Sequence, residues 1–455
     1  MTKDLRGREV VVVGMARSGM AAAQFLKSLG AVVTVSDHRP ASDLNDEILR
    51  LKAQGIAWET GGHTEALFEK AESIVVSPGV PLRLPLLQKA KARGKEVISE
   101  IELAFRHIRG KILAITGTNG KTTTTTLTGE LLRQADRHVQ VGGNIGTALI
   151  SLVTTSTPTT WNVVEMSSFQ LEAIPTFRPD IAVVLNITPD HLDRYASFED
   201  YVQAKLNIFS HQTRSDFAVL NQEDASLRAV AGSLTAPVFW FSAAREVPCG
   251  TFFDGANLVW KNAAHAERII PRSEVALRGS HNVENVAAAI TAARLAGVEG
   301  AVIARGVKAF RPVEHRLEPV AEIRGVLFYN DSKATNVDAT IKALEAFESG
   351  LIVILGGRDK GGDFTPLAAL IRSRVKRIVL LGEASGKIEN QLAGSALMDR
   401  AHSMEHAVKL AFEQSEKGDT VLLAPACASF DMFLDYEHRG REFKKAVRKL
   451  QDSVL

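Results

Sequence analysis

Short apolar runs recur along this chain, with turns and helical stretches between them. The first run is Glu9-Val-Val-Val-Val. A glycine-containing turn at 14–19 follows it, and then come a helical stretch as far as Gly30 and a second apolar run at 31–37. Strand, turn, helix and strand in this order form a βαβ unit, from which parallel sheets are built. The pattern therefore predicts an α/β protein.

The same alternation divides the chain into three segments. The first continues to about residue 109, a new strand at 111–116 opens the second, and a turn-containing linker at 310–316 precedes the third. We predict three domains, each with a largely parallel sheet flanked by helices: a Rossmann-like N-terminal domain, a P-loop-type central ATPase domain and a Rossmann-like C-terminal domain. Their predicted bounds are 1–109, 110–312 and 313–455.

Composition and charge narrow the class of protein. Of the 455 residues, 45% are hydrophobic and 23% are charged, as in ordinary globular proteins. The formal net charge of +2 does not favour nucleic acid as a partner, and the apolar runs fall far short of the roughly 20 residues of a membrane-spanning helix. The N-terminus lacks a signal-like apolar stretch, and Cys249 and Cys427 are the only cysteines. We expect a cytoplasmic monomer that binds neither nucleic acid nor membrane.

The clearest chemical motif follows the strand predicted at 111–116. There the chain reads Gly117-Thr-Asn-Gly-Lys-Thr before a threonine-rich helical stretch. Backbone N–H groups of such a loop converge on phosphate oxygens, a lysine neutralises them, and a threonine hydroxyl can bind Mg²⁺. The glycine spacing differs from that of the standard P-loop, but the strand and the Lys-Thr pair favour an ATP site over a chance turn. The predicted ATP contacts are Gly117, Thr118, Asn119, Gly120, Lys121, Thr122 and Thr123, and Thr122 is also a predicted metal ligand.

A carboxylate and a histidine follow two further predicted strands. Glu165 comes just past the run at 161–164, and His191 follows the run at 180–185, next to Asp190. The carboxyl ends of parallel strands share one sheet edge, so both side chains can approach the phosphate loop. Mg²⁺ binds carboxylates, phosphates and water, which makes Glu165 a candidate ligand. His191 fits either this site or a structural position at the surface.

These motifs, taken in order, resemble the Mur ligases of peptidoglycan precursor synthesis, and the resemblance covers nearly the whole chain. It implies an enzyme that uses ATP to form an amide bond. The reaction it points to is ligation of D-glutamate to UDP-N-acetylmuramoyl-L-alanine through an acyl phosphate. The stretches that carry the resemblance are 117–122, 165–172, 186–194, 201–205, 315–316, 330–336, 356–360 and 425–430.

The resemblance assigns roles that the residues alone do not. Lys205 matches the family's carbamylated lysine, in which a CO₂-derived carbamate turns the amine into a carboxylate-like metal ligand. Without the resemblance it would be a solvated helix residue. The implied cofactors are ATP and two Mg²⁺ ions, with Lys121, Glu165, His191 and Lys205 as catalytic residues and the last three as metal ligands. Positions that match further nucleotide contacts are Asn282, Asn285, Arg316 and Asp331.

In this family the N-terminal domain binds the UDP part of the substrate. The turn at 14–19 lacks the middle glycine of the dinucleotide fingerprint, so it is weak evidence for NAD but suits a pyrophosphate cradle. Asp37, at the end of the second strand, fits either an acceptor for a ribose hydroxyl or a plain strand-end turn. The implied contacts with the UDP substrate are Ser18, Asp37, Arg39, Gly79, Asn144 and Ser167.

For the incoming amino acid, the resemblance points to the third domain. A lysine and hydroxyl groups suit the two carboxylates of glutamate, because they pair with anions or donate to them. Tyr436 fits the core as well as a binding site, and Lys333 fits either a phosphate contact or the surface. The implied contacts are Thr335, Lys360, Ser429, Phe430 and Tyr436.

Three rival functions stay open. The nearest is another amide ligase of the same superfamily, either a different Mur ligase or a folylpolyglutamate-type enzyme. The second is an NAD-dependent oxidoreductase built on the first βαβ unit. The third is a non-catalytic nucleotide-binding switch, which would need the phosphate loop but not Glu165, His191 and Lys205 together.

Overall fold

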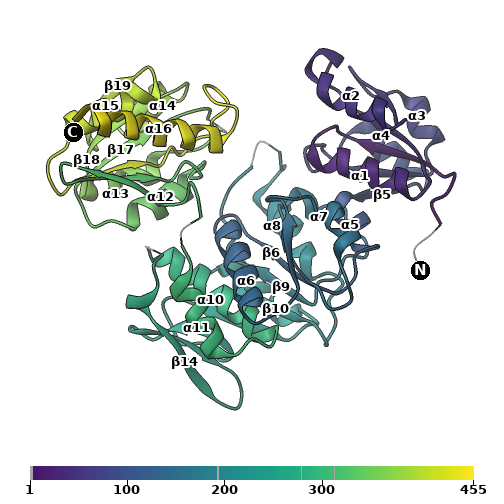
Figure 1. The fold of residues 1–455 in the computed structure, drawn as a ribbon, viewed down its shortest axis with the longest axis horizontal. Coiled ribbons are helices and arrows are strands. Elements are labelled where there is room, and N and C mark those ends of the chain that lie inside the picture. Colours follow the sequence, from purple (N-terminus) through teal and green to yellow (C-terminus); the bar gives the residue numbers. More distant parts are fainter. Residues whose placement is uncertain (1–3, 192–193, 278, 312, 360, 455) are drawn as a thin grey trace. The chain divides into compact units, whose positions relative to one another are not determined.

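Three sheets organise the chain, and Figure 1 shows them with the helices that flank them. The computed structural model describes residues 4–191, 194–277, 279–311, 313–359 and 361–454. One sheet falls within each predicted domain, while the predicted domain bounds themselves remain predictions. By residue contacts the chain forms two compact units, one of Met1–Ile187, Arg194–Ile270 and Val286–Val307, the other of Thr188–Asp193, Pro271–Asn285 and Lys308–Leu455.

The N-terminal sheet is parallel, with the strand order β3-β2-β1-β4-β5. Side chains of its central strand alternate between two cores: Val10 and Val12 pack into one cluster, and Val11 and Val13 into another. The apolar run therefore reflects burial on both faces, as expected for a central parallel strand. Its strands are β1 (Glu9–Val13), β2 (Val32–Ser36), β3 (Ala57–Glu59), β4 (Ser73–Val76) and β5 (Glu96–Ser99), and its helices are α1 (Arg17–Ser28), α2 (Asn45–Ala53), α3 (Glu65–Lys70), α4 (Pro85–Ala92) and α5 (Glu100–Phe105).

The central sheet has the strand order β14-β13-β12-β11-β10-β9-β6-β8-β7. The pairings from β7 to β12 are parallel, as predicted, whereas β12 and β13 pair antiparallel in an extension of the sheet that the sequence pattern did not predict. The strands are β6 (Lys111–Thr116), β7 (Val139–Gly143), β8 (Trp161–Glu165), β9 (Ile181–Val184), β10 (Phe217–Asn221), β11 (Val238–Ser242), β12 (Gly250–Phe253), β13 (Asn257–Lys261) and β14 (Ala266–Pro271). The helices are α6 (Lys121–Gln134), α7 (Leu149–Leu152), α8 (Phe198–Leu206), α9 (Ala225–Val230), α10 (Ser280–Leu295) and α11 (Gly300–Ala309).

The C-terminal sheet has the order β15-β16-β20-β17-β18-β19, parallel except for the edge strand β15. The last strand, β20, is inserted between β16 and β17, so the chain order reverses there. Ligands of α/β proteins bind at such switch points, beyond the carboxyl ends of the strands. The strands are β15 (Glu318–Ile323), β16 (Val326–Asn330), β17 (Leu351–Leu355), β18 (Val375–Leu381), β19 (Leu397–Ala401) and β20 (Thr420–Leu423), and the helices are α12 (Val337–Glu345), α13 (Ala368–Arg374), α14 (Ser385–Gln391), α15 (Met404–Glu413) and α16 (Tyr436–Val454).

The remaining helical segments are short 3₁₀ turns within the connecting loops. In the part of the chain that the structure describes, no helix combines the length and the apolar character needed to cross a bilayer. The turns are η1 (Ala41–Asp43), η2 (Val153–Thr155), η3 (Phe169–Leu171), η4 (Asn207–Phe209), η5 (Ala231–Ser233), η6 (Arg272–Glu274) and η7 (Thr365–Leu367).

Candidate active site

The predicted phosphate loop lies between the end of β6 and the start of α6. Gly120 has φ +83° and caps the helix, a backbone conformation that glycine adopts without strain. A Cβ on Gly117 would lie 2.9 Å from Cβ of Leu185, so this position also requires glycine. Lys121 folds over the loop, with Nζ donating to the carbonyl oxygens of Gly117 and Thr118 at 2.7 Å each. The first-turn N–H groups and the dipole of α6 favour an anion at this helix start.

Asn186, which the sequence interpretation did not single out, fixes the shape of this loop. Its backbone oxygen accepts from the N–H of Thr118 and its side-chain oxygen from the N–H of Asn119, both at 2.8 Å. Asn186 follows β9, the strand next to β6. A strand-end position was the only signal in the sequence that could have indicated this role.

Glu165 is the last residue of β8 and is buried, with 1% of its surface exposed. Oε1 accepts a hydrogen bond of 2.8 Å from Nδ2 of Asn144, whereas Oε2 has no partner among the described residues. A buried carboxylate oxygen without a partner is costly unless a cation or water binds it. The donor chemistry fits Mg²⁺, which prefers carboxylate oxygens.

Lys205 lies on α8 beside the phosphate loop and is 1% exposed, which excludes the solvated position that its neighbours in the sequence indicated. Its Nζ donates to the carbonyl oxygen of Gly117 at 2.8 Å and lies 4.7 Å from the centre of the Tyr201 ring. The hydroxyl of Tyr201 in turn lies 3.0 Å from Oγ1 of Thr118. Lys205 therefore has the location that a metal ligand near the phosphate loop needs, and its carbamylation remains a prediction.

His191 belongs to the second compact unit, whereas Glu165, Lys205 and Thr122 belong to the first. The segment that carries His191 bonds to the start of α12: Nδ2 of the N-cap residue Asn336 donates to Asp190 at 3.1 Å, and Oγ1 of Thr188 donates to Asp338 in the first turn at 3.3 Å. His191 has φ +56°, a strained conformation for a residue with a side chain. The predicted metal ligands are thus distributed over the two units.

A second group of predicted nucleotide contacts meets within the second unit. Asn282, Arg316, Leu317 and Tyr329 contribute to the lining of one cavity. Arg316 lies between two residues with positive φ, His315 at +64° and Leu317 at +41°. Nδ2 of Asn285 donates to Oδ1 of Asn282 at 3.1 Å, and this hydrogen bond joins the two predicted nucleotide contacts on α10.

Asp331 lies close to this segment and is buried. Its Oδ1 accepts from the N–H of Leu317 at 3.3 Å. Burial raises the pKa of Asp331 to about 7, although the charge of Arg316 and the Leu317 N–H oppose the rise. The structure therefore places Asn282, Asn285, Arg316 and Asp331 within one region of the second unit.

The turn after β1 forms a tight cradle. A Cβ on Gly19 would lie 1.9 Å from the carbonyl oxygen of Gly14, so only glycine allows this approach. Asp37 accepts from the N–H of Met15 at 2.7 Å and pairs with Arg39 at 2.9 Å. Burial acts to raise the pKa of Asp37, but the hydrogen bonds from Arg39 and Met15 outweigh it and lower the pKa to about 2. Asp37 thus stabilises the cradle itself. This role fits the strand-end turn better than an acceptor whose oxygens are free for a ribose hydroxyl.

The other predicted UDP contacts lie on loops of the same unit. The carbonyl oxygen of Gly79 accepts from Nη1 of Arg194 at 3.2 Å. Oγ of Ser167 lies 3.1 Å from Oε1 of Gln170, in the turn after Glu165. Arg17, next to the predicted contact Ser18, donates to the carbonyl oxygen of Asn144 at 3.2 Å. It thus links the cradle to the loop after β7, whose Asn144 side chain donates to Glu165. Sequence reasoning assigned no role to Arg17.

The predicted amino-acid contacts follow β16 and β20. Ser429 is buried and Phe430 is 61% exposed. Tyr436 begins α16 and is partly exposed, so it is not a fully buried core residue. The centre of its ring lies 3.7 Å from Nζ of Lys333, and its backbone oxygen accepts from Ser332 at 2.8 Å. Thr335 lies in the loop between β16 and α12, and Lys360 lies outside the described residues.

Known protein families and individual proteins match this chain over nearly its full length. Three family models match consecutive parts of the chain: Mur ligase MurD-like N-terminal domain at 8–99, Mur ligase middle domain at 115–293 and Mur ligase glutamate ligase domain at 315–427. Proteins named UDP-N-acetylmuramoylalanine--D-glutamate ligase are similar over nearly the full length. The one from Acidobacterium capsulatum is 52% identical over 98% of this chain and 97% of its own, and the one from Koribacter versatilis is 49% identical over 99% of each.

Solved structures share the fold at lower identity. A pseudomurein peptide ligase type C from Methanothermus fervidus matches 98% of this chain and all of its own, with a TM-score of 0.63 and 20% identity. A UDP-N-acetylmuramate-alanine ligase from Thermotoga maritima matches 98% of this chain and 99% of its own, with a TM-score of 0.61 and 18% identity. At these identities the likenesses concern the fold alone.

Proposed function

Because the chain belongs to the Mur ligase family, we infer that it catalyses ATP-dependent ligation of D-glutamate to UDP-N-acetylmuramoyl-L-alanine in peptidoglycan precursor synthesis. The structural observation that carries this proposal is the buried carboxylate of Glu165, which has one oxygen without a partner among the described residues and lies in the same unit as the phosphate loop. This pairing suits a metal-assisted phosphoryl transfer. It gives no support to an NAD-dependent oxidoreductase, and the MurD-like match at 8–99 argues against one.

The reaction has two chemical steps. An oxygen of the L-alanyl carboxylate first attacks the γ-phosphorus of ATP. The new O–P bond gives an acyl phosphate, and the bond between the γ-phosphorus and the β–γ bridging oxygen breaks, which releases ADP. The amine of D-glutamate then attacks the acyl carbon, a C–N bond forms, the C–O bond to phosphate breaks, and the amine loses a proton. Both reactants in the first step are anionic, so the protein's main task is to position them and offset their repulsion.

Residues around the phosphate loop would offset this repulsion. The Lys121 ammonium lies against the loop that would hold the phosphates. We propose that Glu165, Thr122, His191 and a carbamylated Lys205 hold two Mg²⁺ ions, which would neutralise charge on the transferring phosphoryl group. The burial of Lys205 supports the carbamate, because the modification would replace a buried cation with an anionic ligand suited to Mg²⁺.

The N-terminal sheet would bind the UDP substrate, and the C-terminal sheet would bind the amino acid. The cradle at 14–19, with Ser18, Asp37, Arg39 and Gly79, would receive the UDP part, with Asn144 and Ser167 nearer the reacting end. Thr335, Ser429, Phe430 and Tyr436 at the switch point of the C-terminal sheet, with Lys360, would receive D-glutamate. We place the enzyme in the cytoplasm with its nucleotide substrates, as a monomer, and both statements remain predictions.

Phosphate release by the purified protein tests this function. The assay contains ATP, Mg²⁺ and UDP-N-acetylmuramoyl-L-alanine, with D-glutamate or with L-glutamate, L-alanine or meso-diaminopimelate as controls. We expect release only with D-glutamate, together with formation of the dipeptidyl nucleotide. Release with a different amino acid would indicate another Mur ligase, and no release with any of them would reject the assignment.

A further inference from the structure

Arg439 on α16 is a buried cation that the proposed mechanism does not use. Only 2% of its surface is exposed, and its hydrogen bonds within the described residues go to neutral oxygens. Burial lowers the pKa of Arg439 to about 10, so the side chain stays charged at neutral pH. The charge of Asp431 favours the charged form of Arg439, but no salt bridge joins Arg439 to a carboxylate among the described residues. A buried charge without a salt bridge is costly, and an apolar side chain of similar volume would usually serve a core better. The cost indicates a task other than packing.

The guanidinium joins the loops that follow two adjacent strands. Nε donates to Oγ of Ser332 at 3.0 Å and Nη2 to the backbone oxygen of the same residue at 2.8 Å. Nη1 donates to the backbone oxygens of Cys427 at 3.1 Å and Ala428 at 3.3 Å. Ser332 follows β16, and Cys427 and Ala428 follow β20, its parallel neighbour. One side chain thus fixes both loops at the carboxyl end of the sheet.

A third loop, after β17, closes on the same group. A Cβ on Gly357 would lie 2.2 Å from the backbone oxygen of Ala428 and 3.1 Å from Nη1 of Arg439, so only glycine lets the loop approach. Arg358 and Ala428 exchange backbone hydrogen bonds of 2.9 and 3.0 Å. Because β20 lies between β16 and β17, the guanidinium sits where the strand order reverses, the expected place for a ligand.

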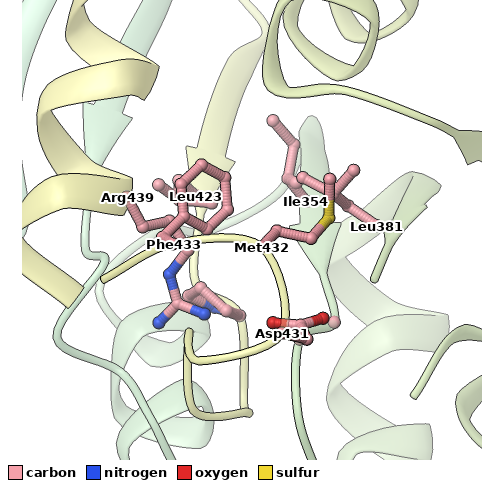
Figure 2. A pocket seen from close by; sticks show the side chains of 10 residues that line it. Ile354, Leu381, Leu423, Asp431, Met432, Phe433 and Arg439 are labelled. Atoms are coloured by element: carbon pink, nitrogen blue, oxygen red, sulfur yellow. The ribbon is translucent and has the colours of Figure 1, made fainter. Parts of the chain in front are cut away.

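Figure 2 shows the surroundings of Arg439. Its guanidinium and the carboxylate of Asp431 lie toward the same side of a small cavity, whose other side is formed by apolar side chains such as Ile354 and Leu381. Oδ2 of Asp431 accepts from the N–H of Glu383 at 3.0 Å. This carboxylate anchors the loop after β18 and also favours the charged form of Arg439, whose own hydrogen bonds go to backbone and hydroxyl oxygens.

Resting on the function proposed above, we propose that Arg439 is a positioning residue for the amino-acid subsite, and that its buried guanidinium holds the three loops so that Ser429 and Thr335 can receive the carboxylates of D-glutamate. Ser429 directly follows Ala428, and Thr335 lies three residues after Ser332 in the same loop. The buried guanidinium of Arg439 also attracts a dicarboxylic amino acid, because the protein interior screens charge less than water does.

Steady-state kinetics of Arg439→Met and Arg439→Lys test this role, with Arg441→Met as the matched control. Arg441 lies on the same helix with a side chain that is 55% exposed. We expect Arg439→Met to raise the KM for D-glutamate by at least about tenfold, because displacement by about 1 Å is enough to disturb a polar site, while the KM values for ATP and the UDP substrate change little. Arg439→Lys should recover part of the loss, because lysine keeps the charge but not the forked geometry. The control should behave as wild type.

An unchanged KM for D-glutamate in both Arg439 variants would overturn the proposal, as would an equal rise in all three KM values. If thermal unfolding shows that Arg439→Met does not fold, Gly357→Ala replaces it, because its Cβ pushes the same loop away from Ala428. The same selective rise in the KM for D-glutamate is then expected. A wild-type enzyme that released phosphate without any need for D-glutamate would instead contradict the proposed function.

Discussion

Within the part of the chain that the structure describes, one carboxylate oxygen of Glu165 has a partner and the other has none, and this asymmetry leads to a prediction at the scale of a single residue. Glu165→Gln keeps an oxygen that can accept from Asn144 but removes the charge. We expect kcat to fall on the order of 10²- to 10³-fold, and the Mg²⁺ concentration for half-maximal rate to rise, because an anionic metal ligand is lost. Glu130→Gln, at an exposed position on α6, is the control and should leave both unchanged.

The stability of the same variant separates a metal ligand from a structural carboxylate. A buried charged oxygen without a partner costs about 1–3 kcal/mol, so removing the charge should not destabilise the metal-free protein. Thermal unfolding without Mg²⁺ should give an equal or higher midpoint for Glu165→Gln than for wild type. A clearly lower midpoint together with unchanged Mg²⁺ dependence would mean that Glu165 serves the fold.

Lys205 gives a second prediction at this scale. If it carries a carbamate, the enzyme incubated with ¹³C-bicarbonate should show a labelled carbamate by NMR, and Lys205→Met should lack it. The variant should also lose at least about 100-fold in kcat, because a metal ligand next to the phosphate loop is missing. Full activity in Lys205→Met would contradict both the carbamate and the metal role.

The residues differ in how far the sequence could predict them. Glu165 was predictable because it ends a recognisable strand, and the loop at 117–122 because its residue types match a known chemistry. Lys205 was not predictable from its neighbours, since its burial depends on packing of α8 against a distant loop. Arg439 carried no signal at all, because charged residues in an amphipathic helix normally face water.

At the scale of elements, the junction of α5 and α7 contains a buried acid whose state depends on pH. Burial raises the pKa of Glu100 to about 7, although the Ile150 N–H and the charge of Arg17 oppose the rise. In the unfolded chain the group titrates near 4.5, so the folded state holds its proton more tightly between these values. Stability should therefore fall as pH rises from about 4.5 to 7.

Glu100→Gln tests this prediction. The variant should match wild type near pH 4.5 and exceed its free energy of unfolding by about 2–3 kcal/mol at pH 8, measured by denaturant unfolding. Glu102→Gln on the same helix is the matched contrast, because Glu102 accepts from Nε of Arg106 at 2.8 Å and from the N–H of Thr176 at 3.1 Å. Removing that charge should destabilise the protein by about 1–3 kcal/mol at pH 8. If both substitutions changed the free energy of unfolding at pH 8 in the same direction, this explanation of the Glu100 pKa would be wrong.

Most elements were predictable because central parallel strands are buried on both faces and are therefore uniformly apolar, as in β1 and β17. The strands β12 to β14 were missed because their burial is mixed and their turns interrupt the pattern. The 3₁₀ turns were missed as well, since one or two hydrogen bonds leave no periodic signal in the sequence.

At the scale of the whole molecule, several predicted groups lie at the carboxyl ends of parallel strands, among them the phosphate loop after β6, Glu165 at the end of β8 and Ser429 after β20, whereas Lys205 lies on α8 and Asn282 and Asn285 lie on α10. The strand-end positions were predictable once the strands were recognised. The insertion of β20 between β16 and β17 was not, because strand order depends on pairing between distant segments. That insertion creates the switch point at which Arg439 joins the loops after β16 and β20.

If the enzyme activates the substrate carboxylate by phosphorylation, an oxygen isotope in that carboxylate must appear in the released phosphate. UDP-N-acetylmuramoyl-L-alanine labelled with ¹⁸O in the alanyl carboxylate is incubated with the enzyme, ATP, Mg²⁺ and D-glutamate, and the released phosphate is analysed by mass spectrometry. We expect one ¹⁸O in each phosphate formed from doubly labelled substrate, since the bond between the acyl carbon and the bridging oxygen breaks in the second step. Unlabelled phosphate alongside the amide product would contradict an acyl phosphate intermediate.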